Sequence, residues 1–210
     1  MSADQHHRAI LQQGLDALQI TINPEPFLDY LNLLHTWNQA YNLTAVRNID
    51  EMISRHLLDS LAILPYLQGS RLLDVGSGAG LPGIPLAIAC PDRQITVLDS
   101  HGKKTRFLLE VKRRLALTNV HVVQSRVEEY HVSDGFDTVT SRAFTQLDRM
   151  MQLTQHLLVE DGLWVAMKST DMHDELCSIK APYQIVTYTV PGTSCVRCSV
   201  LIRNEQKKGK

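Results

Sequence analysis

The segment that decides the fold is Arg71–Gly83, with the sequence RLLDVGSGAGLPG. Its first five residues are mostly apolar and end at Val75, as is typical of a buried strand. Three glycines at alternate positions, Gly76, Gly78 and Gly80, follow at once. Glycine lets a backbone turn sharply and approach a ligand where any Cβ would collide. We therefore expect a ligand-binding loop directly after the first strand of an α/β sheet.

The chain around this segment alternates short apolar runs with helix-compatible stretches. The first five expected strands are joined by helical crossovers, which predicts a parallel sheet. Only Pro191-Gly192-Thr193 separates the last two, which predicts a hairpin and an antiparallel final strand. The sequence thus predicts an α/β fold with a seven-stranded, mostly parallel sheet and a C-terminal antiparallel hairpin. The expected strands are Arg71–Val75, Gln94–Asp99, Val120–Gln124, Phe136–Ser141, Leu163–Lys168, Tyr183–Val190 and Ser194–Arg203.

The beginning of the chain has a different periodicity. Apolar residues recur at helical spacing over 27–37 and 52–64, and Pro65 ends the pattern. We therefore divide the chain into an N-terminal helical extension, residues 1–66, and a ligand-binding α/β domain, residues 67–210.

Composition narrows the classes of partner. The 210 residues, 44% of them hydrophobic, suffice for one α/β domain and a smaller appendage. A net charge of −1 argues against a globally basic nucleic-acid binder but leaves room for a local basic patch. No apolar run reaches the ~18 residues of a membrane span, and the N-terminus lacks a signal-peptide pattern, so we expect a cytoplasmic protein. Cys195 and Cys198 lie three apart on an expected strand and face opposite ways, so we expect no metal. No feature indicates an obligate protein partner.

Two acids indicate the kind of ligand. Asp74 precedes the first glycine by two residues, where its carboxylate would attract the amino group of a methionine moiety and repel a pyrophosphate. Asp99 ends the second strand, where an acid hydrogen-bonds ribose hydroxyls; the alternative is a helix cap. The rival ligand is a dinucleotide, because Gly78–Gly83 also fits G-x-G-x-x-G. Pro82 and Pro85 weigh against it, since they remove N–H groups that would hold a pyrophosphate. We favour S-adenosylmethionine.

The adenine of such a cofactor should lie after the third strand. The sequence there is Ser125-Arg126-Val127-Glu128-Glu129. The Val127 backbone and the Glu128 side chain can pair with the adenine edge. Taken alone, Glu128 would be read as a solvated loop acid.

Seven short motifs along the chain can be compared with those of known protein families. They are HTWN (35–38), YNLT (41–44), RHLLDS (55–60), DVGSGAGLPG (74–83), LDS (98–100), SRVE (125–128) and SRAF (141–144). Through these motifs, nearly the whole chain resembles the small-subunit ribosomal RNA methyltransferase G family, also called glucose-inhibited division protein B. The resemblance implies the class I S-adenosylmethionine methyltransferase fold and methylation of guanine N7 in the 530-loop region of 16S ribosomal RNA. The RNA would be free or within the small-subunit particle.

The same resemblance implies particular contacts. Cofactor contacts carry over to Gly76, Leu81, Val127, Glu128 and Arg142. The family usually has Lys-Gly after its fifth strand, whereas here Lys168, an expected substrate contact, precedes Ser169. The substrate-side loop therefore need not have the family's shape.

The chemistry can also be narrowed by what the sequence lacks. No cysteine nucleophile follows a strand, as cytosine C5 methylation requires. The loop after the fourth strand is Ser141–Phe144 and not the Asn/Asp-Pro-Pro-aromatic loop typical of exocyclic amine methylation. Guanine N7 has a free lone pair and needs only positioning. We expect Arg142 to bridge cofactor and substrate as the catalytic residue, and Phe144 to stack on the base. The alternatives are an ion pair and core packing.

The phosphates of an RNA substrate would be bound by cationic side chains. We expect Lys103 and Arg106 to contact RNA, with a basic tail at residues 207, 208 and 210; the alternative is an ordinary charged helix face. His56, which most resembles a general base, should not take part in the chemical step. Two other functions remain open: a nicotinamide-dependent dehydrogenase and a ribosome-binding module without catalysis.

Overall fold

The structure is a computed structural model that describes residues 2–169 and 172–204. The expected basic tail at Lys207, Lys208 and Lys210 lies outside these residues. Among the described residues, no helix is long and apolar enough to cross a membrane.

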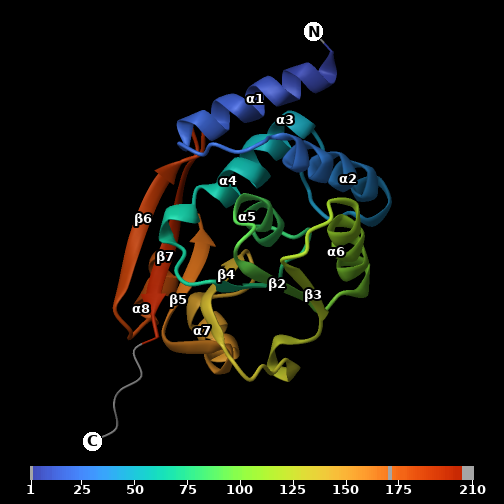
Figure 1. Ribbon diagram of the computed structural model, residues 1–210. Helices are drawn as coiled ribbons and strands as arrows, with labels where there is room; N and C mark the ends of the chain where they lie inside the picture. Colours follow the sequence, from blue (N-terminus) through green and yellow to red (C-terminus); the bar gives the residue numbers. More distant parts are fainter. Residues whose placement is uncertain (1, 170–171, 205–210) are drawn as a thin grey trace, which may run out of the picture.

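The architecture is a seven-stranded sheet in the order β3-β2-β1-β4-β5-β7-β6 (Figure 1). The pairs β1–β2, β1–β4, β2–β3 and β4–β5 are parallel, while β7 runs antiparallel to both β5 and β6. The predicted mostly parallel sheet with a C-terminal antiparallel hairpin is therefore confirmed. The strands are β1 (Arg71–Val75), β2 (Gln94–Asp99), β3 (Val120–Gln124), β4 (Phe136–Arg142), β5 (Leu158–Lys168), β6 (Tyr183–Thr189) and β7 (Val196–Arg203).

Strand boundaries differ from the prediction mainly in β5, which begins at Leu158 and not at Leu163. Phe136 pairs with Leu158 and Thr138 with Leu163, so extra residues bulge out of β5 between these pairs. Asp161 in the bulge has φ +61°, a backbone conformation that the alternation of apolar residues does not reveal. The ends of β4, β6 and β7 differ by one or two residues, as strand ends usually do.

The helices begin with two long ones that precede the sheet. They are α1 (Ala3–Ala17) and α2 (Glu25–Tyr41), followed by α3 (Ile49–Met52), a π-helical turn η1 (Ile53–Leu58), α4 (Asp59–Leu61) and a 3₁₀ turn η2 (Leu64–Tyr66). The remainder are α5 (Gly83–Ala89), α6 (Gly102–Arg114), η3 (Val127–Glu129), α7 (Leu147–Thr154), η4 (Gln155–Leu157) and α8 (His173–Cys177). The helical spacing over 52–64 did not reveal the π turn, which widens the helix at Arg55 and His56.

Alternate residues of the central strands enter two separate cores. Leu72, Val97 and Val165 face α1, α2, α5 and α6. Leu73, Val139 and Trp164 face the opposite side, which α7 covers (Figure 1). The N-terminal helices pack into the same core as α5 and α6. At the proposed boundary near residue 66 the chain therefore changes from helices to the α/β sheet, while the two parts share one hydrophobic core.

Candidate functional site

The glycine loop leaves β1 and turns beside the end of β2. The N–H groups of Gly76 and Ser77 both donate to the carbonyl oxygen of Leu98, at 2.9 and 3.0 Å. Gly76 has φ +68°, and a Cβ there would lie 2.5 Å from Cδ2 of Phe144. A Cβ on Gly78, at φ +58°, would meet nothing closer than 3.9 Å. Gly76 thus lets Phe144 approach the loop, while Gly78 turns toward open space that a ligand can fill.

Asp99 closes the other side of this space at the end of β2. Its carboxylate accepts hydrogen bonds from the N–H groups of Gly78 and His101, both at 2.9 Å, and lies 3.4 Å from Nζ of Lys104. Burial by itself would raise the pKa of Asp99, but these N–H groups and the Lys104 ammonium outweigh it and hold the pKa below its usual value. Asp99 is therefore a charged acceptor. Its other contacts are Nδ1 of the exposed His101 side chain, at 3.1 Å, and the Lys104 ammonium, and a ligand hydroxyl can take the place of either.

A cavity of about 470 Å³ lies between this loop and the ends of β2 and β3. We call it the glycine-loop cavity. Five of the residues predicted from the sequence line it: Gly76, Asp99, Val127, Glu128 and Phe144. Phe144 also packs against the core on the α7 side of the sheet, so its ring serves both the core and the cavity wall.

The other predicted residues of the loop and its surroundings do not line this cavity: Asp74, Gly78, Gly80 and Leu81. Asp74 is fully buried and its Oδ2 accepts from the Gly83 N–H at 2.9 Å, while Oδ1 has no partner among the described residues. Burial raises the pKa of Asp74 to about 7. A Cβ on Gly80 would lie 2.5 Å from Ile84, so close packing explains this glycine. The position of Asp74 thus favours a role in holding the loop.

A second cavity, of about 540 Å³, opens on the other side of Ala143. We call it the arginine cavity. Ala143 lines both cavities and has φ +53°, a conformation that is uncommon for a residue with a Cβ. The arginine cavity is lined by Thr44, Ala45, Val46, Arg55, His56, Asp59, Arg142, Met167, Lys168, Ser169, Glu175, Tyr188 and Arg197.

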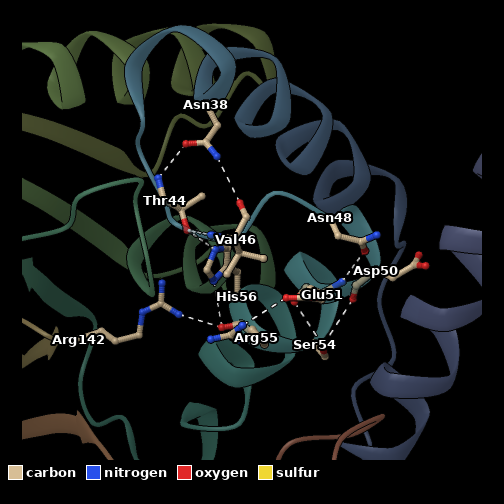
Figure 2. Close-up of polar contacts among 10 residues, drawn as sticks. All are labelled: Asn38, Thr44, Val46, Asn48, Asp50, Glu51, Ser54, Arg55, His56 and Arg142. Atoms are coloured by element: carbon tan, nitrogen blue, oxygen red, sulfur yellow. Dashed lines mark hydrogen bonds and ion pairs between the residues drawn. The ribbon is translucent and has the colours of Figure 1, made fainter.

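Arg142 enters the arginine cavity from the end of β4. Its Nη1 donates to the carbonyl oxygen of Arg55 at 3.0 Å (Figure 2). The same nitrogen lies 3.5 Å from Oδ2 of Asp59. The π turn thus presents a backbone acceptor to this guanidinium. The ion pair considered as an alternative role for Arg142 is present, and the side chain still lines the cavity.

His56 joins the π turn to the loop after α2. Its Nδ1 lies 3.0 Å from the Arg55 carbonyl oxygen, which can only accept, so Nδ1 carries the hydrogen. Nε2 then accepts from Oγ1 of Thr44 at 2.8 Å (Figure 2). Burial, reinforced by the Arg142 charge, lowers the pKa of His56 to about 4. His56 is therefore neutral near pH 7.

Asn38 holds the Thr44–Val46 wall of the cavity in place. It is buried on α2, and its amide accepts from the Thr44 N–H at 2.9 Å and donates to the Val46 carbonyl at 3.2 Å (Figure 2). The HTWN and YNLT motifs therefore build one wall of the arginine cavity.

The predicted substrate cations occupy different places. Lys168 lines the arginine cavity, where its Nζ lies 2.6 Å from Glu175 and 2.9 Å from the Thr145 carbonyl oxygen. Lys103 and Arg106 are exposed on α6 and line neither cavity.

Several residues that line the cavities were not predicted from the sequence, among them Lys104, Asp59, Tyr188 and Arg197. Tyr188 and Arg197 reach the site because β7 inserts between β5 and β6, which no local pattern shows. Among residues 2–169 and 172–204, no cluster of three metal-ligating side chains is found.

The fold is similar to that of several solved structures. A methyltransferase from Aquifex aeolicus described as dependent on S-adenosylmethionine aligns with a TM-score of 0.56 at 15% identity, covering 72% of this chain and 93% of that one. TYW2 from M. jannaschii, solved in complex with AdoMet, gives a TM-score of 0.51 at 14% identity, covering 67% and 71%. These likenesses show the class I methyltransferase fold.

Sequence comparisons are more specific. Residues 23–198 match the family model described as rRNA small subunit methyltransferase G. A protein named ribosomal RNA small subunit methyltransferase G from Legionella pneumophila (strain Lens) is 52% identical over 201 residues, covering 96% of this chain and 97% of the relative. The protein of the same name from Ectopseudomonas mendocina (strain ymp) is 48% identical, covering 97% and 99%.

The residues of the glycine-loop cavity can be compared with what the cofactor of this family needs. S-adenosylmethionine is the family's cofactor, and the glycine-loop cavity has what it needs: the turned backbone at Gly76, a charged acceptor at Asp99 and an apolar wall at Val127 and Phe144. The residues present fit the group. The chain belongs to the rRNA small subunit methyltransferase G family.

Proposed function

We propose that this protein transfers a methyl group from S-adenosylmethionine to N7 of a guanine in the 530-loop region of 16S ribosomal RNA, in the cytoplasm. The observation that carries the proposal is Ala143, which lines both cavities. A base in the arginine cavity would meet a methyl donor in the glycine-loop cavity at this residue. The placement of reactants side by side is itself the main catalytic device.

The residues of the glycine-loop cavity would hold the cofactor. Asp99 would bind the ribose hydroxyls, and the Val127 backbone with Glu128 would bind the adenine edge. The Gly76–Gly78 backbone would follow the methionine part. The cofactor, when bound, supplies an electrophilic methyl group on a sulfonium. Arg142 would lie where cofactor and base meet, within the arginine cavity.

The arginine cavity suits a nucleophile that carries no proton. Its histidine, His56, is neutral and has both ring nitrogens hydrogen-bonded, so it is poorly placed to remove a proton. No cysteine of the described residues lines it. Both features favour a purine N7 over cytosine C5, which needs a thiolate.

RNA is the substrate class that the charges favour. Arg55, Arg142, Lys168 and Arg197 line one cavity of a chain whose net charge is −1. A guanine within an RNA helix hides N7 in the deep major groove, so the target must be unstacked to enter the arginine cavity. Phe144, the expected stacking partner, lines the glycine-loop cavity and not this one. The substrate would be 16S ribosomal RNA, free or in the small-subunit particle.

Lys103 and Arg106 extend the cationic surface outside the cavities. Reversing both charges should lower RNA methylation and flatten its salt dependence, because each lost phosphate contact lowers the salt slope. Affinity for S-adenosylhomocysteine should not change, which calorimetry would check. Methylation equal to that of the wild type at all salt concentrations would show that this is only a solvated helix face.

The test of the proposed function uses purified protein, S-adenosylmethionine with a labelled methyl group, and two RNAs. One carries guanosine at the modified position and the other 7-deazaguanosine, which lacks N7. We expect labelled 7-methylguanosine from the first RNA and no label in the second. Equal labelling of both would show that another atom is methylated, and no labelling of any ribosomal RNA or particle would indicate a binding module. Tight NADH binding without S-adenosylhomocysteine binding would indicate a dehydrogenase.

A further inference from the structure

We propose that Asp59 recognises the target base by accepting hydrogen bonds from N1–H and the 2-amino group of guanine. This assignment rests on the proposed function, because it names the group that selects guanine within the same site. Asp59 would be a specificity-determining residue, touching the base at the edge opposite N7.

The first support is the incomplete hydrogen bonding of this carboxylate. Asp59 lies on α4, only 6% exposed, and lines the arginine cavity. Its two contacts are long: Oδ2 lies 3.5 Å from Nη1 of Arg142, and Oδ1 lies 3.5 Å from the hydroxyl of Tyr188. Good charged hydrogen bonds are about 2.7–2.9 Å. A carboxylate with about four acceptor sites therefore keeps room for two further donors from the cavity.

The second support is the position of Asp59 relative to Ala143. Ala143 marks where the methyl group would pass, and Arg142, its chain neighbour, lies between Ala143 and Asp59. A purine that places N7 at Ala143 extends its six-membered ring away from that residue. The N1–H and 2-amino donors on the far side of that ring would then face the part of the cavity wall that Asp59 forms with Arg142.

The third support is electrostatic. Burial raises the pKa of Asp59 above its usual value, and the charges of Arg142 and Arg197 offset this only in part, so the carboxylate is poorly solvated. Two N–H donors from guanine would satisfy it. Adenine would instead turn its N1 lone pair toward the carboxylate, which leaves a buried charge facing an acceptor.

The other carboxylate of the cavity is bound to the cavity wall by shorter contacts. Glu175 is held at short distances by Nζ of Lys168, at 2.6 Å, and by the N–H of Leu147, at 3.0 Å. Both contacts use the same oxygen, Oε2, and tie it to the cavity wall. Glu175 is therefore the matched control: a carboxylate in the same cavity that is already engaged.

The test crosses protein variants with substrate analogues. The RNA carries either guanosine or inosine at the target position; inosine keeps N7, O6 and N1–H and lacks only the 2-amino group. In single-turnover methylation, the wild type should lose about 10- to 100-fold in rate over affinity with inosine, as expected for one hydrogen bond to a charged group. Asp59→Asn should be slow with both RNAs and discriminate between them by less than about 3-fold, since an amide is a weaker acceptor than a carboxylate.

Glu175→Gln should retain the wild-type ratio between guanosine and inosine, whatever its absolute rate. Binding of S-adenosylhomocysteine shows that each variant is folded, and Asp59→Ser replaces Asp59→Asn if the latter does not bind it. An Asp59 variant that keeps the wild-type ratio overturns the proposal and leaves Asp59 only holding Arg142. A wild type that makes no 7-methylguanosine from guanosine RNA refutes the proposed function itself, and the Asp59 assignment with it.

Discussion

Replacing Asp99 with alanine should weaken cofactor binding more than any other single change in the glycine-loop cavity. The carboxylate is 3% exposed, ionised, and already binds the N–H groups of Gly78 and His101 at 2.9 Å. Nδ1 of His101 and Nζ of Lys104 complete its contacts, at 3.1 and 3.4 Å, and both belong to side chains that line the cavity. The ribose hydroxyls of the cofactor would replace these two side-chain contacts.

The magnitude follows from these contacts. A hydrogen bond to a charged group contributes roughly 1.5–3 kcal/mol, so loss of the ribose contact should weaken S-adenosylhomocysteine binding by about 10- to 100-fold. The Gly78 and His101 N–H groups would also lose their acceptor. We expect about 1–2 kcal/mol of lost stability from these two groups, since water can reach a partly open loop.

The assay is titration calorimetry with S-adenosylhomocysteine, together with urea unfolding to separate affinity from stability. Asp92→Ala is the control, because Asp92 is an exposed acid just before the opposite end of the same strand. That variant should match the wild type in both measurements. Wild-type affinity in a folded Asp99→Ala protein would refute the assignment of the ribose to Asp99.

Three further outcomes are expected. Single-turnover methyl transfer should be nearly flat from about pH 6.5 to 9, because the pKa of His56 is already lowered to about 4; a histidine-like inflection abolished by His56→Gln would mean that a proton is removed. The free energy of unfolding of the wild type, relative to that of His56→Gln, should rise with pH from about 4 to 6.5 and then level off. In that range the unfolded state holds a proton on His56 that the folded state does not. A difference between the two unfolding free energies that decreases with pH, measured by urea titration, would contradict this. Gly76→Ala should lower cofactor affinity, because the added Cβ displaces Phe144. Gly192→Ala is the control: this glycine has φ +77° and no atom within 4 Å of an added Cβ, so the change should cost only the backbone strain of ~1–2 kcal/mol. Equal affinity for S-adenosylhomocysteine in both variants would exclude the displacement.

The fold could be predicted from local sequence because its signals are local. The glycine loop after β1, the alternation of strands and helices, and the Pro191-Gly192-Thr193 turn each lie within a few residues. The bulge in β5 was missed because it depends on how Phe136 and Thr138 pair across the sheet. The π turn at Ile53–Leu58 was missed because its apolar spacing resembles that of an α-helix.

The glycine-loop side of the site was more predictable than the other side. Gly76, Asp99 and Val127 lie at or just after the carboxyl ends of β1, β2 and β3, and the carboxyl ends of parallel strands meet at one edge of a sheet. The arginine cavity is assembled from α4, β4 and β7, which are distant in sequence. Nothing near Arg197 or Tyr188 in the chain indicates that β7 inserts beside β5, so their place could come only from the structure.

The most direct measurement is to compare the modified nucleosides of 16S ribosomal RNA from a strain lacking this protein with those from the same strain carrying the gene. Nucleoside mass spectrometry counts 7-methylguanosine, and chain cleavage at that nucleoside locates it. The account predicts that one 7-methylguanosine in the 530-loop region disappears without the protein and returns with it. An unchanged pattern, or the loss of a methyl group from another atom or base, would contradict it.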